Sequence, residues 1–261
     1  MVLARHAIVA WLWKRFIAFT DRQRVFMKRR RPGLQDRWAS VVNSLQEVIP
    51  SYEEASSMIS IHADRRLRAT CVAFAVERGY LVLDLGAGPG VMSRLVAAKG
   101  GEPVLLDVSQ AMLAASRFPN RVRAIFEFLP FREGVFDAVV SGFALRDAID
   151  LPRAIGQLSR ALKPRGKLGF CDLGKPDSAV ASLVVALYLR LVPIIVGLAT
   201  TGVAGLRYGS IYDTYVLVLR NSELKALLSN HFESVEIEKT QFGGSIVAKC
   251  VNRARPSSTA R

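Results

Sequence analysis

The feature that most constrains this fold is a glycine-rich turn placed between an apolar strand and a helix. Residues 81–86 (LVLDLG) form a short apolar run that leads through Gly86, Gly88 and Gly90 into the helical pattern VMSRLVAAKG (91–100). Glycine lets the backbone approach a ligand closely, and the first turn of the following helix presents unpaired N–H groups. The pattern therefore predicts an α/β domain with a ligand site at this turn.

The spacing of the glycines narrows the kind of ligand. A dinucleotide fingerprint, G-x-G-x-x-G, would need its third glycine at Val91, whereas this turn reads G-x-G-x-G with Asp84 two residues ahead of it. The next expected strand (103–107) ends in Asp107, 17 residues after Gly90. A carboxylate there can accept both ribose hydroxyls of an adenosyl group. The sequence thus favours an adenosyl ligand, with a glycine turn in an ordinary α/β domain as the alternative.

Strands and helices alternate through the rest of the chain. Further strands are expected at residues 121–128, 136–142 and 166–173, and a helix at 152–163. The last two strands flank Gly243 and Gly244, which is a hairpin signal. This order predicts a doubly wound α/β fold with a seven-stranded, mostly parallel sheet and a terminal antiparallel hairpin. Residues 41–80 are mainly helical in pattern, so we expect a helical cap at the start of a domain that spans 41–252.

Positive charge is concentrated at the ends of the chain. The formal net charge is +14, of which residues 1–40 carry +8 and residues 253–261 carry +3, leaving +3 for residues 41–252. An enzyme that acts on nucleic acid needs a basic groove in its folded part, so no nucleic-acid partner is expected. The three cysteines are far apart and form no Cys/His cluster, so neither a disulfide framework nor a metal site is expected. Residues 253–261 are expected to be a basic, disordered tail.

Residues 1–40 have the composition of a basic amphipathic arm. Their apolar run 7–13 is far shorter than the roughly 20 residues that span a bilayer, and no small-residue cleavage site of a secretory signal follows it. Apolar and tryptophan residues at helical spacing beside a basic cluster are typical of a helix that lies on an anionic membrane surface. Two alternatives stay open: a solvated or docking arm, and an extension upstream of a start at Met27.

A second apolar segment covers residues 179–200. Of these 22 residues 17 are apolar and only Arg190 is charged, which approaches the composition of a transmembrane helix. The segment lies between the strand at 166–173 and the terminal hairpin of the same sheet, so a single crossing would separate strands that must pair. Pro193 and Gly197 are expected to break it into two helices. We therefore expect an apolar helical lid within an insertion at 177–221.

These motifs resemble the class I S-adenosylmethionine-dependent methyltransferases, and more narrowly the ubiquinone/menaquinone-biosynthesis C-methyltransferase family. The resemblance covers roughly residues 48–250, and its most specific part is GFALRDAID (142–150), where that family carries a Phe-Gly-Leu-Arg-Asn run. The other matching runs are VLDLGAGPG (82–90), LLDVSQAML (105–113), LPF (129–131), LSRALKPRGKL (158–168), SELKALL (222–228) and GGSIVA (243–248). The resemblance implies a class I methyltransferase fold with S-adenosylmethionine as cofactor.

The resemblance also implies cofactor-binding residues. Asp84 and the three glycines of the turn would surround the methionine part of the cofactor, Asp107 would hold its ribose, and Met112 would line the adenine side. Ile125 and Phe126 stand where the family has Asp or Asn followed by Ala, so an adenine contact is expected from the backbone or from Glu127. Gly142 stands where the family has Ser.

The residues expected to act on the substrate follow from the same comparison. Arg146 matches the active-site Arg of the family, and Asp147 replaces its Asn. A phenol has a pKa near ~10, so a ring hydroxyl needs a base or a nearby cation to ionise, and these two residues would supply them. Tyr52 and His62 match residues of the family's cap segment, with His62 about two residues out of register. The alternative for the pair at 146–147 is a surface ion pair at a helix start.

Two further positions, Phe143 and Tyr208, are expected to contact the substrate. For Tyr208, as for Tyr52, packing in the core is the alternative. Cys171 is expected to pack in the core, because the Pro-Cys or Thr-Cys signature of cytosine methyltransferases is missing. The apolar lid favours a lipid substrate, since each buried methylene gains ~0.8 kcal/mol.

The sequence therefore predicts an enzyme that C-methylates a polyprenyl benzo- or naphthohydroquinone at the cytoplasmic face of an anionic membrane. A homodimer is among the expected assemblies. The alternatives are a methyltransferase for another lipid, one for RNA, and a non-catalytic cofactor-binding scaffold.

Overall fold

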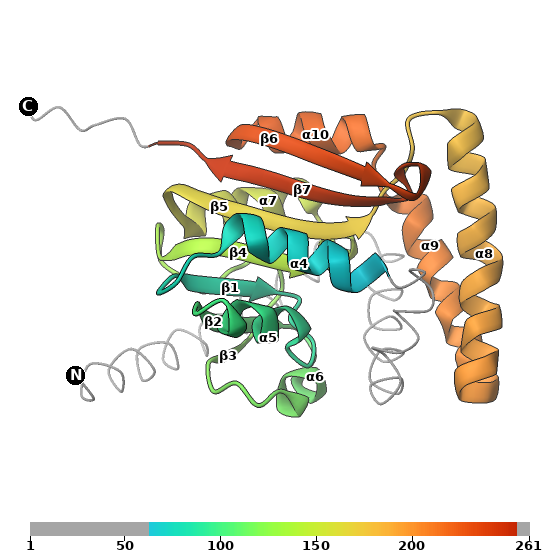
Figure 1. Cartoon of the computed structure of the whole chain (residues 1–261), viewed down its shortest axis with the longest axis horizontal. Coiled ribbons are helices and arrows are strands. Elements are labelled where there is room, and N and C mark those ends of the chain that lie inside the picture. Colours follow the sequence, from blue (N-terminus) through green and yellow to red (C-terminus); the bar gives the residue numbers. More distant parts are fainter. Residues whose placement is uncertain (1–62, 255–261) are drawn as a thin grey trace, which may run out of the picture.

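The computed structural model describes residues 63–254, drawn in colour in Figure 1. The basic arm (1–40), most of the expected cap, and residues 255–261 of the tail lie outside the described residues. Tyr52 and His62 lie outside them as well, so their expected roles stay predictions.

The core of the fold is one seven-stranded sheet with strand order β3-β2-β1-β4-β5-β7-β6. In chain order the strands are β1 (Leu81–Leu85), β2 (Glu102–Asp107), β3 (Arg121–Arg123), β4 (Phe136–Gly142), β5 (Leu162–Leu173), β6 (Phe232–Thr240) and β7 (Ser245–Asn252). Strands β1 to β5 pair in parallel, whereas β7 runs antiparallel to both β5 and β6. The predicted doubly wound fold with a terminal hairpin is confirmed.

Helices cover both faces of the sheet (Figure 1). On one face α4 (Ala63–Ala75) and α5 (Val91–Ala98) pack over Val82 and Val140. On the other face α7 (Leu151–Ala161) and α10 (Asn221–Ser229) pack over Leu83 and Phe170. The short helix α6 (Gln110–Ala115) lies beside β2 and β3. Alternate residues of the central strands therefore enter two separate cores, as expected of a sheet buried on both faces.

The register of the parallel strands brings their carboxyl ends to one edge. In β1, Asp84 pairs with Leu105 of β2 and with Val140 of β4. The Ser141 hydroxyl donates a hydrogen bond of 2.8 Å to the Leu85 carbonyl and ties the ends of β4 and β1 together. Ligands of open α/β sheets bind outside this edge, so the fold positions the glycine turn and the end of β4 for a common site.

The third strand is shorter than the sequence predicts. The expected strand at 121–128 ends at Arg123, and a turn follows in which Phe128 N–H donates to the Ile125 carbonyl at 3.3 Å. Ile125 is buried in this turn. The apolar run therefore reflects burial beside the sheet rather than a longer strand.

The apolar segment after β5 forms one helix and not two. Helix α8 (Ala179–Thr201) continues through Pro193, so the predicted break there is wrong. A proline removes one backbone donor. Val185 and Leu189 pack against Tyr215 before Pro193, and Val196 packs against Tyr208 after it, so tertiary contacts hold both sides of the helix. The helix ends at Gly202, whose φ of 62° lies in the left-handed region that glycine adopts readily.

The chain returns from α8 through a 3-10 segment, η3 (Gly202–Gly209), and α9 (Ser210–Leu217). Residues 179–200 are long and apolar enough to cross a bilayer by length and composition alone, and an 18-residue stretch within them has a mean hydropathy of 2.4. Strand β5 precedes this insertion and the hairpin of β6 and β7 follows it. Strand β7 pairs with β5, so both sides of the insertion belong to one sheet, as expected from the sequence. In Figure 1, α8 and α9 stand beyond the carboxyl ends of the parallel strands.

Candidate active site

The glycine turn at the end of β1 combines a tight packing contact with an open position. The φ values of Gly86, Gly88 and Gly90 are 67°, 52° and 92°, all in the left-handed region. A Cβ built on Gly86 would lie 2.3 Å from the Ala144 Cβ. Among the residues that the structure describes, one built on Gly88 would meet only the Met112 Sδ, at 4.0 Å. Gly86 is therefore needed so that the turn can touch the end of β4, and Gly88 faces space that a ligand can enter.

Asp107 reaches from the end of β2 to this turn. Its Oδ2 accepts a 2.8 Å hydrogen bond from Gly88 N–H, and its Oδ1 accepts one of the same length from Ser109 N–H. Burial raises the pKa of the Asp107 carboxyl above its usual range. Each carboxylate oxygen has a second lone pair, so the group is able to accept the two hydroxyls of a ribose beside Gly88.

Asp84 lies fully buried under the turn. Its Oδ2 accepts hydrogen bonds from Ser93 N–H at 2.9 Å and from the Ser93 hydroxyl at 2.6 Å, which fastens the turn to α5. Its Oδ1 is buried and has no partner among the described residues. Burial raises the pKa of Asp84 to about 6. The contact expected between Asp84 and the methionine part of S-adenosylmethionine stays a prediction, and this buried acceptor without a described partner is the observation that supports it.

The expected adenine side is built from apolar groups. Met112 and Ile125 are buried, and the Phe126 ring lies against Gly86. Glu127 instead makes a contact within the protein: its Oε1 accepts a 2.9 Å hydrogen bond from Asp150 N–H at the start of α7. The cofactor contacts expected of Met112, Ile125 and Phe126 stay predictions, and the Glu127 carboxylate holds a helix terminus.

The structure explains why glycine occupies position 142. A Cβ built on Gly142 would lie 2.2 Å from Nη1 of Arg68, a buried residue of α4. That Nη1 donates to the Gly142 carbonyl at 3.3 Å, and the guanidinium lies 5.1 Å from the centre of the Phe143 ring. Arg68 thus takes the place that a serine side chain would need. The sequence gives no sign of this role for Arg68, because only the fold brings α4 to the end of β4.

Phe143, the first residue after β4, has a positive φ of 61°. Its N–H donates to the Cys171 carbonyl at 2.7 Å, so β5 holds the residue in this conformation. Positive φ in a bulky residue is strained and is common near functional sites. The strained residue directs the chain from β4 into the short 3-10 helix η2 (Leu145–Asp147).

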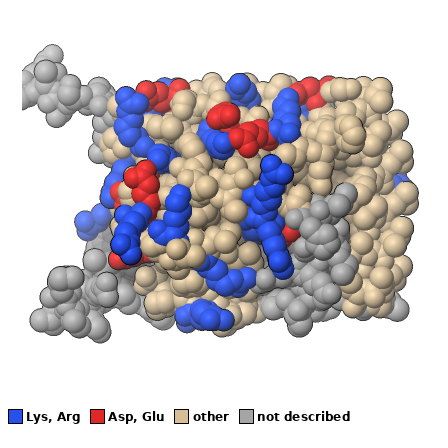
Figure 2. Space-filling view, in the orientation of Figure 1, with Lys and Arg blue, Asp and Glu red and all other residues tan. Residues whose placement is uncertain are grey.

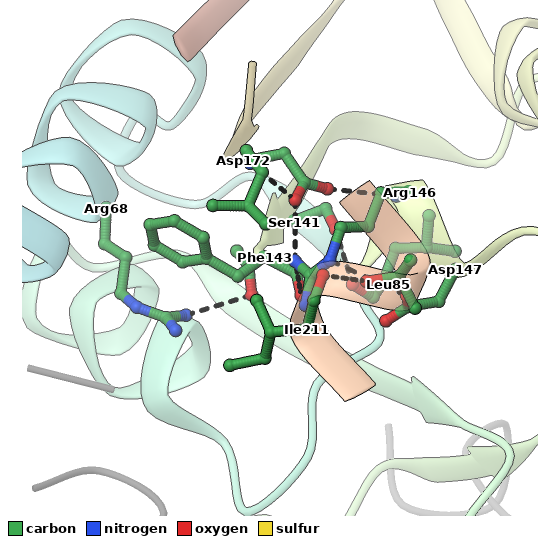
Figure 3. A network of polar contacts seen from close by, with 11 residues as sticks. Arg68, Leu85, Ser141, Phe143, Arg146, Asp147, Asp172 and Ile211 are labelled. Carbon is green, nitrogen blue, oxygen red and sulfur yellow. Dashed lines mark hydrogen bonds and ion pairs between the residues drawn. The ribbon is translucent and has the colours of Figure 1, made fainter. Parts of the chain in front are cut away.

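Arg146 of η2 is held by Asp172 from the end of β5 (Figure 3). Asp172 Oδ1 lies 2.7 Å from Arg146 Nη1, and its Oδ2 accepts from Arg146 N–H at 3.0 Å. The same Nη1 donates to the Phe143 carbonyl at 2.7 Å. The side chains of Arg146 and Asp172 are 14% and 4% exposed, so this is a nearly buried ion pair and not a surface one.

Asp147 lies beside the Arg146 guanidinium, with 3.6 Å between its Oδ1 and the Arg146 Nε. Burial raises the pKa of Asp147 to about 6, against the lowering effect of Arg146 and with a further rise from Asp172. A carboxylate with this pKa is mostly ionised at pH 7 and binds a proton more tightly than an ordinary aspartate. The pair at 146–147 thus joins a fixed cation to a strengthened base.

The two residues expected to contact the substrate lie in different parts of the structure. Phe143 belongs to the polar network, whereas Tyr208 is buried in η3 against Val196 and Ile211. Ile211 of α9 lies next to the same network in Figure 3. The lid helices therefore reach the Arg146 region through Ile211.

The cysteines take no part in this site. Cys171 is fully buried with Cys71 between α4 and the sheet, which agrees with the predicted packing role. The pKa of the Cys71 thiol is raised well above its usual range by its contact with Cys171 and by burial. Within residues 63–254 no group of His, Cys, Asp and Glu side chains is arranged to hold a metal ion.

The parallel sheet, the glycine turn after β1 and the acid that ends β2 together define a class I S-adenosylmethionine-dependent methyltransferase. The family model described as a methyltransferase domain matches residues 83–170. A demethylmenaquinone methyltransferase of Thermus thermophilus is 31% identical over 209 residues, covering 76% of this chain and 94% of the relative. Another, from Clavibacter sepedonicus, is 30% identical over 187 residues, covering 68% of this chain and 76% of the relative.

Solved structures agree on the fold. An S-adenosylmethionine-dependent methyltransferase from Thermotoga maritima superposes with a TM-score of 0.56 at 14% identity, covering 81% of this chain and 99% of that one. A phosphoethanolamine N-methyltransferase of Haemonchus contortus, in complex with S-adenosylmethionine, gives 0.53 at 16% identity, covering 72% and 52%. From its curated relatives, the chain belongs to the family of the demethylmenaquinone methyltransferases, class I methyltransferases of quinone biosynthesis.

Proposed function

We propose that the protein transfers a methyl group from S-adenosylmethionine to a ring carbon of a polyprenyl benzo- or naphthohydroquinone. The observation that carries the proposal is the contact of the glycine turn with the end of β4. Because Gly86 packs against Ala144, the cofactor turn touches the segment that holds Arg146 and Asp147 two and three residues later. The names of the curated relatives support a quinone as the substrate class.

The chemistry follows from the charges at the end of β4. When bound, S-adenosylmethionine supplies an electrophilic methyl group. A ring carbon next to a phenolic hydroxyl becomes a good nucleophile once that hydroxyl is deprotonated. Asp147 takes this proton, and the Arg146 guanidinium stabilises the phenolate that forms. The carbon–carbon bond forms as the methyl–sulfur bond breaks, and S-adenosylhomocysteine is the leaving group. The same ring carbon then loses its hydrogen as a proton to water, which restores the aromatic ring, and the ring oxygen takes back the proton held by Asp147.

Asp172 acts on this chemistry through Arg146. Its two oxygens bind the backbone N–H and the Nη1 of Arg146, so the guanidinium needs no rearrangement when the phenolate forms. Fixed charges that face a developing charge lower the barrier without a reorganisation cost. Asp172 is therefore a positioning residue and is not expected to touch the substrate.

The lid helices support a lipid substrate. Beyond the carboxyl edge of the sheet, α8, η3 and α9 present apolar side chains, and they reach the Arg146 network through Ile211 (Figure 3). A long prenyl tail needs such a surface, whereas a small polar substrate does not. We accordingly propose that the enzyme works at the inner face of a membrane, as a cytoplasmic protein bound to its surface.

The proposal is tested with the purified chain, S-adenosylmethionine and a reduced, demethylated naphthohydroquinone in detergent. We expect methylated product from the reduced ring only, because the oxidised quinone has no hydroxyl to ionise.

Asp147→Asn should lower kcat about 100-fold or more without changing the cofactor Kd. The matched control is Asp150→Asn, which makes the same change in charge at the N-cap of α7, where asparagine caps equally well. Absence of product would overturn the proposal. Full activity of Asp147→Asn, which restores the residue that the family carries there, would remove Asp147 as the base and leave the proposed reaction standing.

A further inference from the structure

The outward face of α8 is an apolar stripe that no described element covers. Six of its side chains repeat at intervals of three or four residues and are 43–74% exposed: Val180, Leu183, Leu187, Leu191, Ile195 and Leu198. They cover about 27 Å at the helical rise of 1.5 Å per residue. Contiguous apolar patches of this length on a protein surface mark interaction sites.

The opposite face of α8 packs against the rest of the protein. Val185 and Leu189 are buried against Tyr215 of α9, and Ile211 packs on the same cluster. The outer stripe is thus not needed to hold α8 on the protein. Figure 2 shows the same division on the surface: charged side chains gather over the sheet, and the part built by α8 carries hardly any on the face shown.

The charge pattern of the segment indicates which occupant it suits. From residue 179 to residue 212 the chain has no acidic residue and two basic ones, Arg190 and Arg207. Arg190 is exposed on the flank of the stripe, with its guanidinium 5.6 Å from the centre of the Tyr212 ring. An apolar stripe flanked by arginine and free of acids complements an anionic lipid surface, because the apolar side chains enter the acyl boundary and the guanidinium stays among the head groups.

We propose that this stripe is the surface by which the protein lies on an anionic bilayer, with the axis of α8 parallel to the membrane. The inner face of α8 contacts Ile211, and Ile211 lies beside the Arg146 network, so one pair of helices separates lipid from the site. A membrane-dissolved substrate would pass along this pair. The inference rests on the proposed function only in its choice of a lipid as the occupant.

The orientation follows from the topology of the chain. Strand β5, which precedes α8, and β7, which follows the insertion, pair from Leu173–Ser245 to Lys167–Val251. If α8 crossed the bilayer, η3 and α9 would have to cross back to reach the sheet, and that return segment contains two charged residues, Arg207 and Asp213. A helix that lies on the membrane surface places its apolar stripe in the lipid and leaves β5 and β7 paired in the sheet.

The test uses the full chain and vesicles of phosphatidylglycerol and phosphatidylcholine, with binding measured by co-sedimentation. The variant Leu187→Asp with Leu191→Asp places two acids on exposed positions of the stripe. The control variant Ala97→Asp with Ala226→Asp adds the same charge on exposed positions of α5 and α10. We expect the wild type and the control to bind equally and the stripe variant to bind about tenfold less or weaker.

A second readout separates this proposal from the proposed function. The stripe variant should lose turnover of a long-tailed hydroquinone in vesicles and keep turnover of a tail-less hydroquinone in solution. If the protein methylates no quinone, vesicle binding still reports on the stripe. Failure of the wild type to bind vesicles, or equal binding by the stripe variant, overturns the docking surface.

Two other occupants of the stripe are tested by measurements without lipid. If a second copy covers the stripe, sedimentation velocity will show a wild-type dimer that the stripe variant converts to monomers. If residues 1–62 cover it, the stripe variant will melt several degrees lower than the control. Either result would contradict the lipid assignment.

Discussion

At the scale of the residue, three aspartates lie at the carboxyl ends of three parallel strands and have different partners. Asp84 is held by Ser93 and keeps one oxygen without a described partner, Asp107 accepts two backbone N–H groups, and Asp172 neutralises Arg146. Burial raises the pKa of Asp84 and of Asp107. The same side chain therefore serves as a buried acceptor, a diol acceptor or a counter-ion, according to the donors around it.

Asp84→Asn should stabilise the protein without ligand and weaken cofactor binding. The folded-state pKa of Asp84, about 6, lies above that of an unfolded aspartate, so folding is penalised once pH exceeds the unfolded pKa, and fully so above about 6. The gain in unfolding free energy should be about 2–3 kcal/mol at pH 8 and vanish below about pH 4. Urea titrations at the two pH values measure it. An equal gain at both values would show that the buried charge is not its cause.

Arg146→Ala should leave the cofactor Kd within about twofold of the wild type and lower kcat about 100-fold, because the guanidinium acts on the phenolate and not on the cofactor. Arg165→Ala is the matched control, since that arginine pairs with Glu233 on the surface. Calorimetry and single-turnover kinetics measure the two quantities. Retention of full kcat would remove Arg146 from the mechanism.

The sequence predicted candidate residues that belong to one continuous motif. It missed residues that come into contact only because the fold brings distant segments together. Asp84, Asp107 and the glycines follow from local spacing. Asp172 pairs with Arg146 only because the parallel register sets Gly142 opposite Cys171, which brings the ends of β4 and β5 together. Its one sequence signal was an acid at the carboxyl end of an expected strand. Arg68 had no such signal, since its contact with Gly142 depends on the packing of α4.

At the scale of the element, the turn between β1 and α5 has two separable functions. Gly86 allows contact with Ala144, and Gly88 leaves space beside Asp107. Substitution at the first position must disturb packing, whereas substitution at the second fills the space and leaves the protein packing intact. The two glycines therefore provide separate tests of folding and of binding.

Gly88→Ala should fold and bind the cofactor about 100-fold more weakly, because the new methyl group enters the open space in front of the turn. Positive φ costs an alanine about 1 kcal/mol wherever it occurs. Gly79→Ala is therefore the matched control: Gly79 has a φ of 82° and nothing within 4 Å of a built Cβ. Thermal melts should show similar small losses in both variants, and calorimetry should show lost affinity only in Gly88→Ala. Equal affinity in both would contradict the position of the cofactor.

Elements with a clear period were predicted well from sequence, and elements set by tertiary contacts were not. The strands at 136–142 and 166–173 and the terminal hairpin follow apolar patterns that the sheet preserves. Helix α8 continues through Pro193 because its packing outweighs the local cost of proline, a balance that sequence does not reveal. The third strand ends early because Ile125 is buried in a turn.

At the scale of the whole molecule, the net charge and the apolar stripe belong to different segments of the chain. The net charge of +14 is carried mainly by the ends of the chain, and the apolar stripe of α8 lies beyond the carboxyl edge of the sheet. The described domain joins a polar cofactor turn to an apolar pair of helices across the Arg146 network. This arrangement suits a reaction that joins a polar donor to a lipid acceptor.

Binding of the cofactor should stabilise the whole domain. At a cofactor concentration about 100 times its Kd, linkage adds about 2.7 kcal/mol to the free energy of unfolding, which should raise the Tm by about 5–10 °C. Asp107→Ala should abolish the shift, because it removes the ribose acceptor. Scanning calorimetry with and without S-adenosylhomocysteine measures both. The same shift in Asp107→Ala would place the cofactor elsewhere.

The most direct measurement follows the methyl group itself. The full chain is incubated with S-adenosylmethionine that carries a deuterated methyl group and with a reduced, demethylated polyprenyl naphthohydroquinone, and the product is analysed by mass spectrometry with fragmentation. We expect one CD₃ group on a ring carbon next to a hydroxyl. A label on oxygen, or an unlabelled quinone from well-folded protein that binds the cofactor, would contradict methyl transfer to the ring.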